Sequence, residues 1–132
     1  MNKICVIDDD LIQHKITERV LNNYGLSNNC TFYQSAANAL LDITLAYFSE
    51  EPLPELIILD KEMPEISGWE FVETFCKVFS PDGRVSVYIV SSSIEAADKE
   101  RSRKYPCVKG LYPKPFSSEI FNSIGSEVVE GS

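Results

Sequence analysis

The sequence has few of the features that mark membrane, secreted or nucleic-acid-binding proteins. None of its apolar runs approaches the roughly 20 residues that a membrane-spanning helix needs, and the N-terminus lacks the pattern of a signal peptide. With 12 basic and 20 acidic residues, the formal net charge of −8 disfavours a surface for nucleic-acid phosphates. We therefore expect neither membrane insertion nor direct nucleic-acid binding.

Residues that bind zinc or cradle nucleotides are also scarce. The four cysteines, Cys5, Cys30, Cys76 and Cys107, lie far apart without a CxxC pair, and His14 is the only histidine. This spacing indicates neither a zinc site nor a disulfide framework, and it predicts small core residues in a reducing, cytoplasmic compartment. We expect His14 to be solvated. The absence of a GxxxxGK run excludes a P-loop.

Short apolar runs alternate with helical patterns along the 132 residues, a length typical of one domain. The apolar runs are too short for helices and predict five buried strands, at residues 4–7, 30–33, 56–60, 85–90 and 108–112. The patterns that follow them predict helices between Asp10 and Gly25 and at residues 35–48, 66–79, 94–105 and 117–128. Strands that alternate with helices form a parallel sheet with right-handed crossovers. We expect one α/β domain over residues 1–130, without an output domain.

Two of the predicted helices have features that bear on function. Trp69 in the third helix is expected to be half-exposed at the surface. The predicted helix 94–105 has a sparse apolar stripe and many basic residues, which indicate a solvated face. Few buried contacts imply low local stability, so we expect this helix to move.

Polar side chains stand at or just beyond the carboxyl ends of four strands. Asp8 and Asp9 follow the first strand, Asp60 ends the third, Ser91 follows the fourth and Lys114 follows the fifth. In a parallel sheet these strand ends lie on one edge, where open α/β folds bind their ligands. Three adjacent carboxylates repel one another unless a cation lies among them, and oxygen ligands favour Mg²⁺. Together with a lysine and a hydroxyl they indicate phosphoryl transfer, with an aspartate as nucleophile.

The sequence resembles the receiver domain of two-component response regulators over essentially its full length, as in stand-alone chemotaxis-type regulators. The resemblance rests on four motifs: residues 6–10 (Val-Ile-Asp-Asp-Asp), residues 59–64 (Leu-Asp-Lys-Glu-Met-Pro) with Gly68, residues 90–92 (Val-Ser-Ser), and residues 114–116 (Lys-Pro-Phe). It implies a flavodoxin-like five-stranded parallel sheet of order 2-1-3-4-5, with helices on both faces.

The resemblance also implies roles for the residues at the strand ends. Asp60 would accept a phosphoryl group from a sensor histidine kinase or a histidine phosphotransfer protein. The Mg²⁺ ligands would be Asp8, Asp9, Asp60 and the backbone carbonyl of Glu62. Lys114 would contact the phosphoryl group, and the Lys114–Pro115 bond would be cis. Ser91 would be the switch hydroxyl, and loss of the phosphoryl group from Asp60 would be self-catalysed. Glu62 and Ser93 occupy the positions that tune this loss.

The sequence departs from the family pattern at the residue that often reads out the switch. Many receivers carry an aromatic residue three places before the lysine, where this chain has Leu111, followed by Tyr112. Neighbouring residues of a strand point to opposite faces, so Tyr112 cannot simply replace the aromatic. We expect a shift of the helix 94–105 to expose a surface for a downstream protein, formed with strand 108–112 and helix 117–128.

Two other functions remain open on the sequence. A receiver-fold module that docks without phosphorylation is compatible with Leu111, although the full set of polar residues argues against it. A haloacid-dehalogenase-type phosphatase also uses an aspartate nucleophile and Mg²⁺, but it expects a second aspartate where this chain has Glu62. A flavodoxin function is disfavoured because the acidic loop after the first strand would repel a flavin phosphate.

Overall fold

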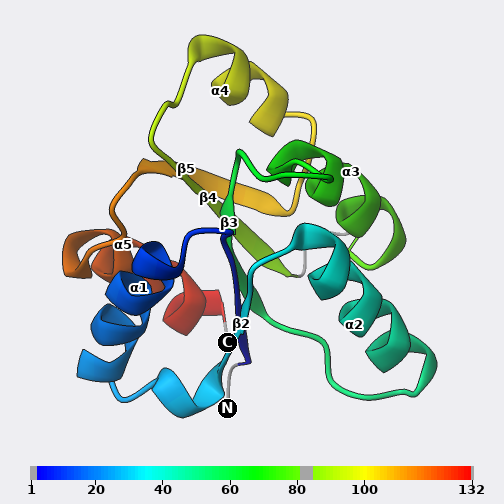
Figure 1. Ribbon diagram of the computed structural model, residues 1–132, viewed down its shortest axis with the longest axis horizontal. Coiled ribbons are helices and arrows are strands. Elements are labelled where there is room, and N and C mark those ends of the chain that lie inside the picture. Colours follow the sequence, from blue (N-terminus) through cyan, green and yellow to red (C-terminus); the bar gives the residue numbers. More distant parts are fainter. Residues whose placement is uncertain (1–2, 81–84, 132) are drawn as a thin grey trace.

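The computed structural model describes residues 3–80 and 85–131 and forms a three-layer α/β fold (Figure 1). Its strands are β1 (Ile4–Ile7), β2 (Cys30–Tyr33), β3 (Leu56–Asp60), β4 (Ser86–Ser91) and β5 (Val108–Pro113). They pair in parallel in the order β2-β1-β3-β4-β5, which confirms the predicted sheet. The helices are α1 (Leu11–Asn23), α2 (Ala36–Phe48), α3 (Gly68–Val78), α4 (Ala96–Ser102) and α5 (Ser118–Gly131), with a short 3₁₀ turn at Ser27–Asn29.

Helices cover both faces of the sheet, so the central strands are buried on both sides. Figure 1 shows α1 and α5 on one face and α2 and α3 on the other, with α4 at one end of the molecule. Along β3, Ile57 and Leu59 pack in the cluster under α2 and α3, whereas Leu56 and Ile58 pack in the cluster under α1 and α5. This alternation explains why the strand reads as one continuous apolar run in the sequence.

Helix caps set the starts of α1 and α3. Asp10 caps α1 by accepting a hydrogen bond from the amide of Ile12 at 2.9 Å. Ser67 and Glu70 form a reciprocal capping box on α3. Helix α3 therefore begins at Gly68, two residues later than expected. The expected helix 94–105 is also shorter, with only the seven residues of α4.

Three side chains differ from their expected environments. Trp69 is only 5% exposed, which corrects the prediction of a half-exposed surface residue. His14 is half-buried, and its Nε2 donates to the carbonyl oxygens of Asp8 (2.5 Å) and Tyr33 (3.0 Å), so it is not simply solvated. Both acceptors are carbonyls, so Nε2 carries the proton.

The cysteines also differ from expectation. Cys76 on α3 and Cys107 before β5 are paired as a disulfide, while Cys5 and Cys30 are free. The prediction of four unpaired core residues is therefore wrong for one pair. The two partners are 31 residues apart and come together only through the packing of α3 beside β5, which no local motif reveals. The paired cysteines therefore give no support to a reducing compartment.

Candidate functional site

The functional site lies at the carboxyl edge of the sheet, where β1 and β3 end side by side. Ile7 and Leu59 are register partners, so the following residues, Asp8 and Asp60, come together. One carboxylate oxygen from each of Asp8, Asp9 and Asp60 lies within 4.8 Å of the other two. We call these three residues the acidic cluster. Asp8 and Asp60 are buried, and Asp9 is exposed at the rim.

The backbone fixes the two buried carboxylates of the acidic cluster. The amide of Asp8 donates to the carbonyl of Tyr33 at 3.0 Å, and Oδ1 of Asp8 accepts from the amide of Asp10 at 2.9 Å. Oδ1 of Asp60 accepts from the amide of Glu62 at 3.4 Å. These bonds hold the carboxylates at the sheet edge before any ligand binds.

Gly68 closes the back of the site, against the end of β3. Its amide donates to the carbonyl of Lys61 at 2.8 Å. A Cβ atom at Gly68 would overlap the carbonyl oxygen of Asp60 and would lie 2.9 Å from Cα of Lys61. Only glycine therefore allows α3 to start this close to Asp60, which explains the glycine that the sequence places eight residues after it.

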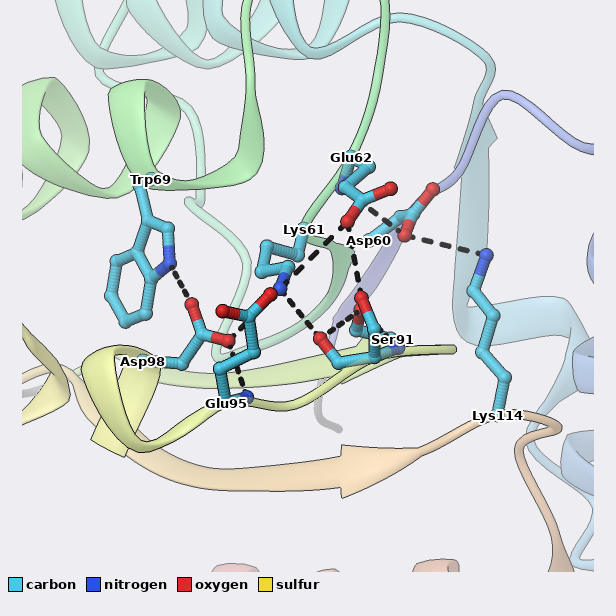
Figure 2. Close-up of polar contacts among 9 residues, drawn as sticks. Asp60, Lys61, Glu62, Trp69, Ser91, Glu95, Asp98 and Lys114 are labelled. Carbon is cyan, nitrogen blue, oxygen red and sulfur yellow. Dashed lines mark hydrogen bonds and ion pairs between the residues drawn. The ribbon is translucent and has the colours of Figure 1, made fainter.

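Lys114 bridges the two buried carboxylates, and Figure 2 shows its ammonium directed at Asp60. Its Nζ is 3.0 Å from Oδ2 of Asp8 and 3.3 Å from Oδ1 of Asp60. The Lys114 amide also donates to the carbonyl of Ser91 at 3.0 Å, which ties the end of β5 to the end of β4. The peptide bond between Lys114 and Pro115 is cis, as the resemblance implied.

The electrostatics of the site follow from burial and from the acidic pair. Burial raises the pKa of Asp60, and the Asp8 carboxylate raises it further, to about 6; Lys114 and the Glu62 amide offset part of this. Burial alone would lower the pKa of Lys114, but its hydrogen bond and ion pairs with Asp8 and Asp60 outweigh burial and hold it above the usual range. Three carboxylates face one ammonium, so the site keeps an excess of negative charge.

The acidic cluster fits a hard divalent cation. It offers oxygen ligands from three side chains, and a divalent charge would balance the excess that Lys114 leaves. Sulfur and imidazole ligands, which zinc prefers, are absent from the described residues that form the cluster. The arrangement is therefore suited to Mg²⁺ and to an incoming oxyanion next to it.

Ser91 ends β4 beside Asp60, and its hydroxyl is engaged by the loop that follows. The hydroxyl accepts from the Ser93 amide at 3.1 Å and donates to the Ser93 carbonyl at 3.2 Å. Ser93 also donates from its own hydroxyl to Oε1 of Glu62 at 3.2 Å, so these two side chains meet above the site. Ser91 therefore stands at the expected edge of the sheet, with its hydroxyl turned to the β4–α4 loop.

Leu111 and Tyr112 separate to opposite faces of the sheet. Leu111 packs against the cluster under α2 and α3, whereas Tyr112 packs against the cluster under α1 and α5 and lies 6.1 Å from the ring of Tyr88. Tyr112 thus cannot occupy the place of Leu111, as the alternation rule predicts.

A set of buried polar contacts that the sequence did not predict lies beside the site. Lys61 directly follows Asp60, and its buried ammonium pairs with Asp98 of α4 at 2.9 Å. The same carboxylate accepts from Nε1 of Trp69 at 3.0 Å (Figure 2). Lys61 and Asp98 have the charges of ordinary surface residues, so no local pattern predicts their burial. The only sequence signal is a lysine directly after a buried strand.

Comparisons with known proteins agree with this geometry. The sequence matches the family described as the response regulator receiver domain over residues 4–122. No curated relative matches it. Among solved structures, a two-component response regulator from Cytophaga hutchinsonii is 23% identical, with a TM-score of 0.81 over 98% of each chain. A CheY-like receiver domain protein from Methanospirillum hungatei is 20% identical, with a TM-score of 0.80 over 99% of this chain and 96% of that one.

The similar structures include one in an activated state. The BeF3-activated receiver domain of DrrB, a Thermotoga maritima protein, is 18% identical, with a TM-score of 0.72 over 98% of each chain. The likeness to these structures bears on the fold, and the family match covers most of the chain. The chain therefore belongs to the response regulator receiver domain family, the phosphoacceptor signalling domains of two-component systems.

Proposed function

We propose that Asp60 is the phosphoacceptor of this receiver domain and that the acidic cluster holds Mg²⁺ during the transfer. The observation that carries the proposal is the convergence of Asp8, Asp9 and Asp60 within 4.8 Å, with Lys114 bridging the two buried carboxylates. The backbone carbonyl of Glu62 completes the proposed ligand set. A bound Mg²⁺ ion would neutralise charge on the phosphoryl oxygens.

The proposed transfer exchanges one bond to phosphorus for another. A carboxylate oxygen of Asp60 attacks the phosphorus atom of a phosphohistidine, and a new P–O bond forms. The P–N bond breaks, and its electron pair leaves with the imidazole nitrogen. Lys114 moves from its ion pair with Asp60 to a phosphoryl oxygen, and the Ser91 hydroxyl turns from the Ser93 carbonyl to another.

Hydrolysis removes the phosphoryl group: water attacks the phosphorus atom, the P–O bond to Asp60 breaks, and inorganic phosphate leaves while the carboxylate is regenerated. We propose that this loss of the phosphoryl group is self-catalysed within the domain and that the chain is otherwise no enzyme. We propose that the side chain of Glu62, which accepts a hydrogen bond from the Ser93 hydroxyl at 3.2 Å, influences this attack. A separate phosphatase function is not needed to explain any residue of the site.

The phosphodonor is expected to reach Asp60 from the rim of the acidic cluster, where Asp9 is exposed, because Asp60 itself is buried. We propose that the donor is a sensor histidine kinase or a histidine phosphotransfer protein. Leu11 and Ile12, directly after the Asp10 cap, are 60% and 69% exposed at that rim and supply an apolar surface for it. The downstream partner is proposed to bind the face of α4, β5 and α5.

We propose that the protein is located in the cytoplasm, where sensor kinases present their phosphohistidine. Within the described residues, no helix is both long enough and apolar enough to cross a membrane.

Intact mass tests the proposed chemistry. Incubation with acetyl phosphate and Mg²⁺ is expected to add one phosphoryl group to the wild-type protein and none to the Asp60→Asn variant. Omission of Mg²⁺ is expected to abolish the adduct in the wild type. A short-lived adduct would escape this assay, so binding of beryllofluoride with Mg²⁺ is measured in parallel. If the wild type gives neither an adduct nor beryllofluoride binding, the phosphoacceptor proposal is wrong and a docking module without phosphorylation is favoured.

A further inference from the structure

Helix α4 is attached to the domain by a polar group. Of its seven residues, Asp98 alone is buried, and the basic residues Lys99 and Arg101 are exposed. Most surface helices are held by an apolar stripe. Here one charged side chain carries the attachment, so the contacts of Asp98 decide where the helix lies.

The carboxylate of Asp98 is fully paired with groups from two other elements. Oδ2 accepts from Nζ of Lys61 at 2.9 Å and from the amide of Glu95 at 2.8 Å, and Oδ1 accepts from Nε1 of Trp69 at 3.0 Å. Burial alone would raise the pKa of Asp98, but these hydrogen bonds outweigh it and hold the pKa below the usual range. Loss of one of these partners would leave a buried charge incompletely paired, which is strongly destabilising. The position of α4 therefore depends on the positions of the groups that pair with Asp98.

Lys61 connects this anchor to the phosphoacceptor. It is the residue next to Asp60 in the chain, and its Nζ also donates to the carbonyl of Ser93 at 2.5 Å. The same carbonyl accepts from the hydroxyl of Ser91 at 3.2 Å (Figure 2). One carbonyl oxygen in the β4–α4 loop is thus shared by the hydroxyl of Ser91 and by the ammonium that holds α4.

We propose that Lys61 is a positioning residue that couples the state of Asp60 and Ser91 to the position of α4. The inference rests on the proposed function, and it assigns the coupling to contacts that the family match does not specify. When the Ser91 hydroxyl turns to a phosphoryl oxygen, the Ser93 carbonyl keeps Lys61 as its donor. The loop and Lys61 then rearrange together, and Asp98 carries the change into α4. This route replaces the aromatic readout that Leu111 cannot provide.

Trp69 gives the route a built-in reporter. It is the only tryptophan of the chain, and it is bonded to Asp98. The guanidinium of Arg101 lies 5.3 Å above its ring, and the ring of Tyr105 is stacked 6.1 Å away. Two residues of α4 and one in the segment that follows it therefore contact one fluorophore, whose emission reports movement of the helix.

The test combines Trp69 emission with amide exchange of residues 94–105, each measured with and without beryllofluoride and Mg²⁺. In the wild type we expect beryllofluoride to change both signals. In Lys61→Met, the hydrogen bond from Trp69 to Asp98 remains, but the amides of α4 are expected to exchange at least ~10-fold faster before activation. The beryllofluoride-induced changes are expected to disappear, although the protein still binds beryllofluoride.

Two further variants separate coupling from stability. Lys77→Met makes the same substitution in an exposed ion pair of α3 with Glu73 (3.5 Å) and is expected to keep the wild-type response. Lys61→Met/Asp98→Leu removes both buried charges, which preserves folding better than removal of one. This double variant is expected to bind beryllofluoride without any change in amide exchange of α4.

The outcomes distinguish this inference from the proposed function. If the double variant shows a change in amide exchange of wild-type size, the coupling through Lys61 is wrong, while phosphorylation of Asp60 stands. If the wild type neither binds beryllofluoride nor takes up a phosphoryl group, the proposed function fails, and the coupling fails with it. An unchanged α4 in a wild type that does bind beryllofluoride overturns the coupling alone.

Discussion

Replacement of Asp60 by asparagine is expected to stabilise the metal-free protein at pH 8. The carboxylate of Asp60 is only 6% exposed and lies near that of Asp8. Burial and repulsion from Asp8 together raise the pKa of Asp60 from 3.8 to about 6. The folded state therefore binds this proton more tightly than the unfolded state does. Stability falls as the pH rises from the unfolded pKa to the folded one, and the loss is complete above pH 6.

The magnitude follows from the same two pKa values. A rise of the pKa from 3.8 to about 6 corresponds to about 3 kcal/mol of lost stability at pH 8, and to about 1 kcal/mol at pH 4.5. Asparagine keeps an oxygen that can accept from Lys114 and carries no charge. The Asp60→Asn variant should therefore be more stable than the wild type by most of these amounts at each pH. Saturating Mg²⁺ should stabilise the wild type and reduce the difference, because a divalent cation offsets the repulsion.

Urea unfolding in EDTA, followed by the emission of Trp69, measures this difference at both pH values. Asp9→Asn is the matched control, because Asp9 belongs to the same acidic cluster but is exposed, and it should change the free energy of unfolding by less than ~1 kcal/mol. If Asp60→Asn is no more stable than the wild type at pH 8, or if its advantage is the same at pH 4.5, the reasoning about a strained acidic pair is refuted.

Three further substitutions test the construction of the site. Gly68→Ala should lower the free energy of unfolding in urea by about 1–3 kcal/mol, because its Cβ would overlap the carbonyl of Asp60; an unchanged midpoint would contradict the close packing. Lys114→Met should slow adduct formation from acetyl phosphate yet tighten Mg²⁺ binding in calorimetry, since one competing positive charge leaves the carboxylates; weaker Mg²⁺ binding would contradict this. Ser67→Ala should cost about 1 kcal/mol of unfolding free energy through loss of the α3 cap; no loss would contradict the capping role.

The sequence predicts the sheet and the main site for one physical reason. Parallel strands bring their carboxyl ends to one edge, so Asp8, Asp60 and Lys114 converge although more than a hundred residues separate the first from the last. Each residue is identified by its place at the end of an apolar run, which is a local signal. The order of the strands came from the resemblance, because apolar runs alone do not say which strand neighbours which.

The contacts around α4 could not be predicted in the same way. Lys61 and Asp98 have the charges of solvated residues, and their burial depends on each other and on Trp69. Trp69 lies three residues before the buried Val72, so helical spacing is compatible with its burial. The partner of its indole, Asp98, comes from α4, which periodicity within α3 cannot reveal.

The same limit applies to the pair of Cys76 and Cys107. Nothing in the spacing of these residues relates them, and the disulfide depends on how α3 packs beside the start of β5. Leu111 and Tyr112 show the opposite case. Alternation within a strand is a local rule with a period of two, so their separation to opposite faces was predictable and is confirmed.

The most direct test of the account is to locate the acyl phosphate within the chain. The protein is incubated with acetyl phosphate and Mg²⁺, reduced with borohydride and digested, and the peptides are sequenced by mass spectrometry. Reduction converts an aspartyl phosphate to homoserine, and we expect homoserine at position 60 alone. Homoserine at position 8 or 9 with none at position 60 would contradict the assignment of Asp60 as the phosphoacceptor.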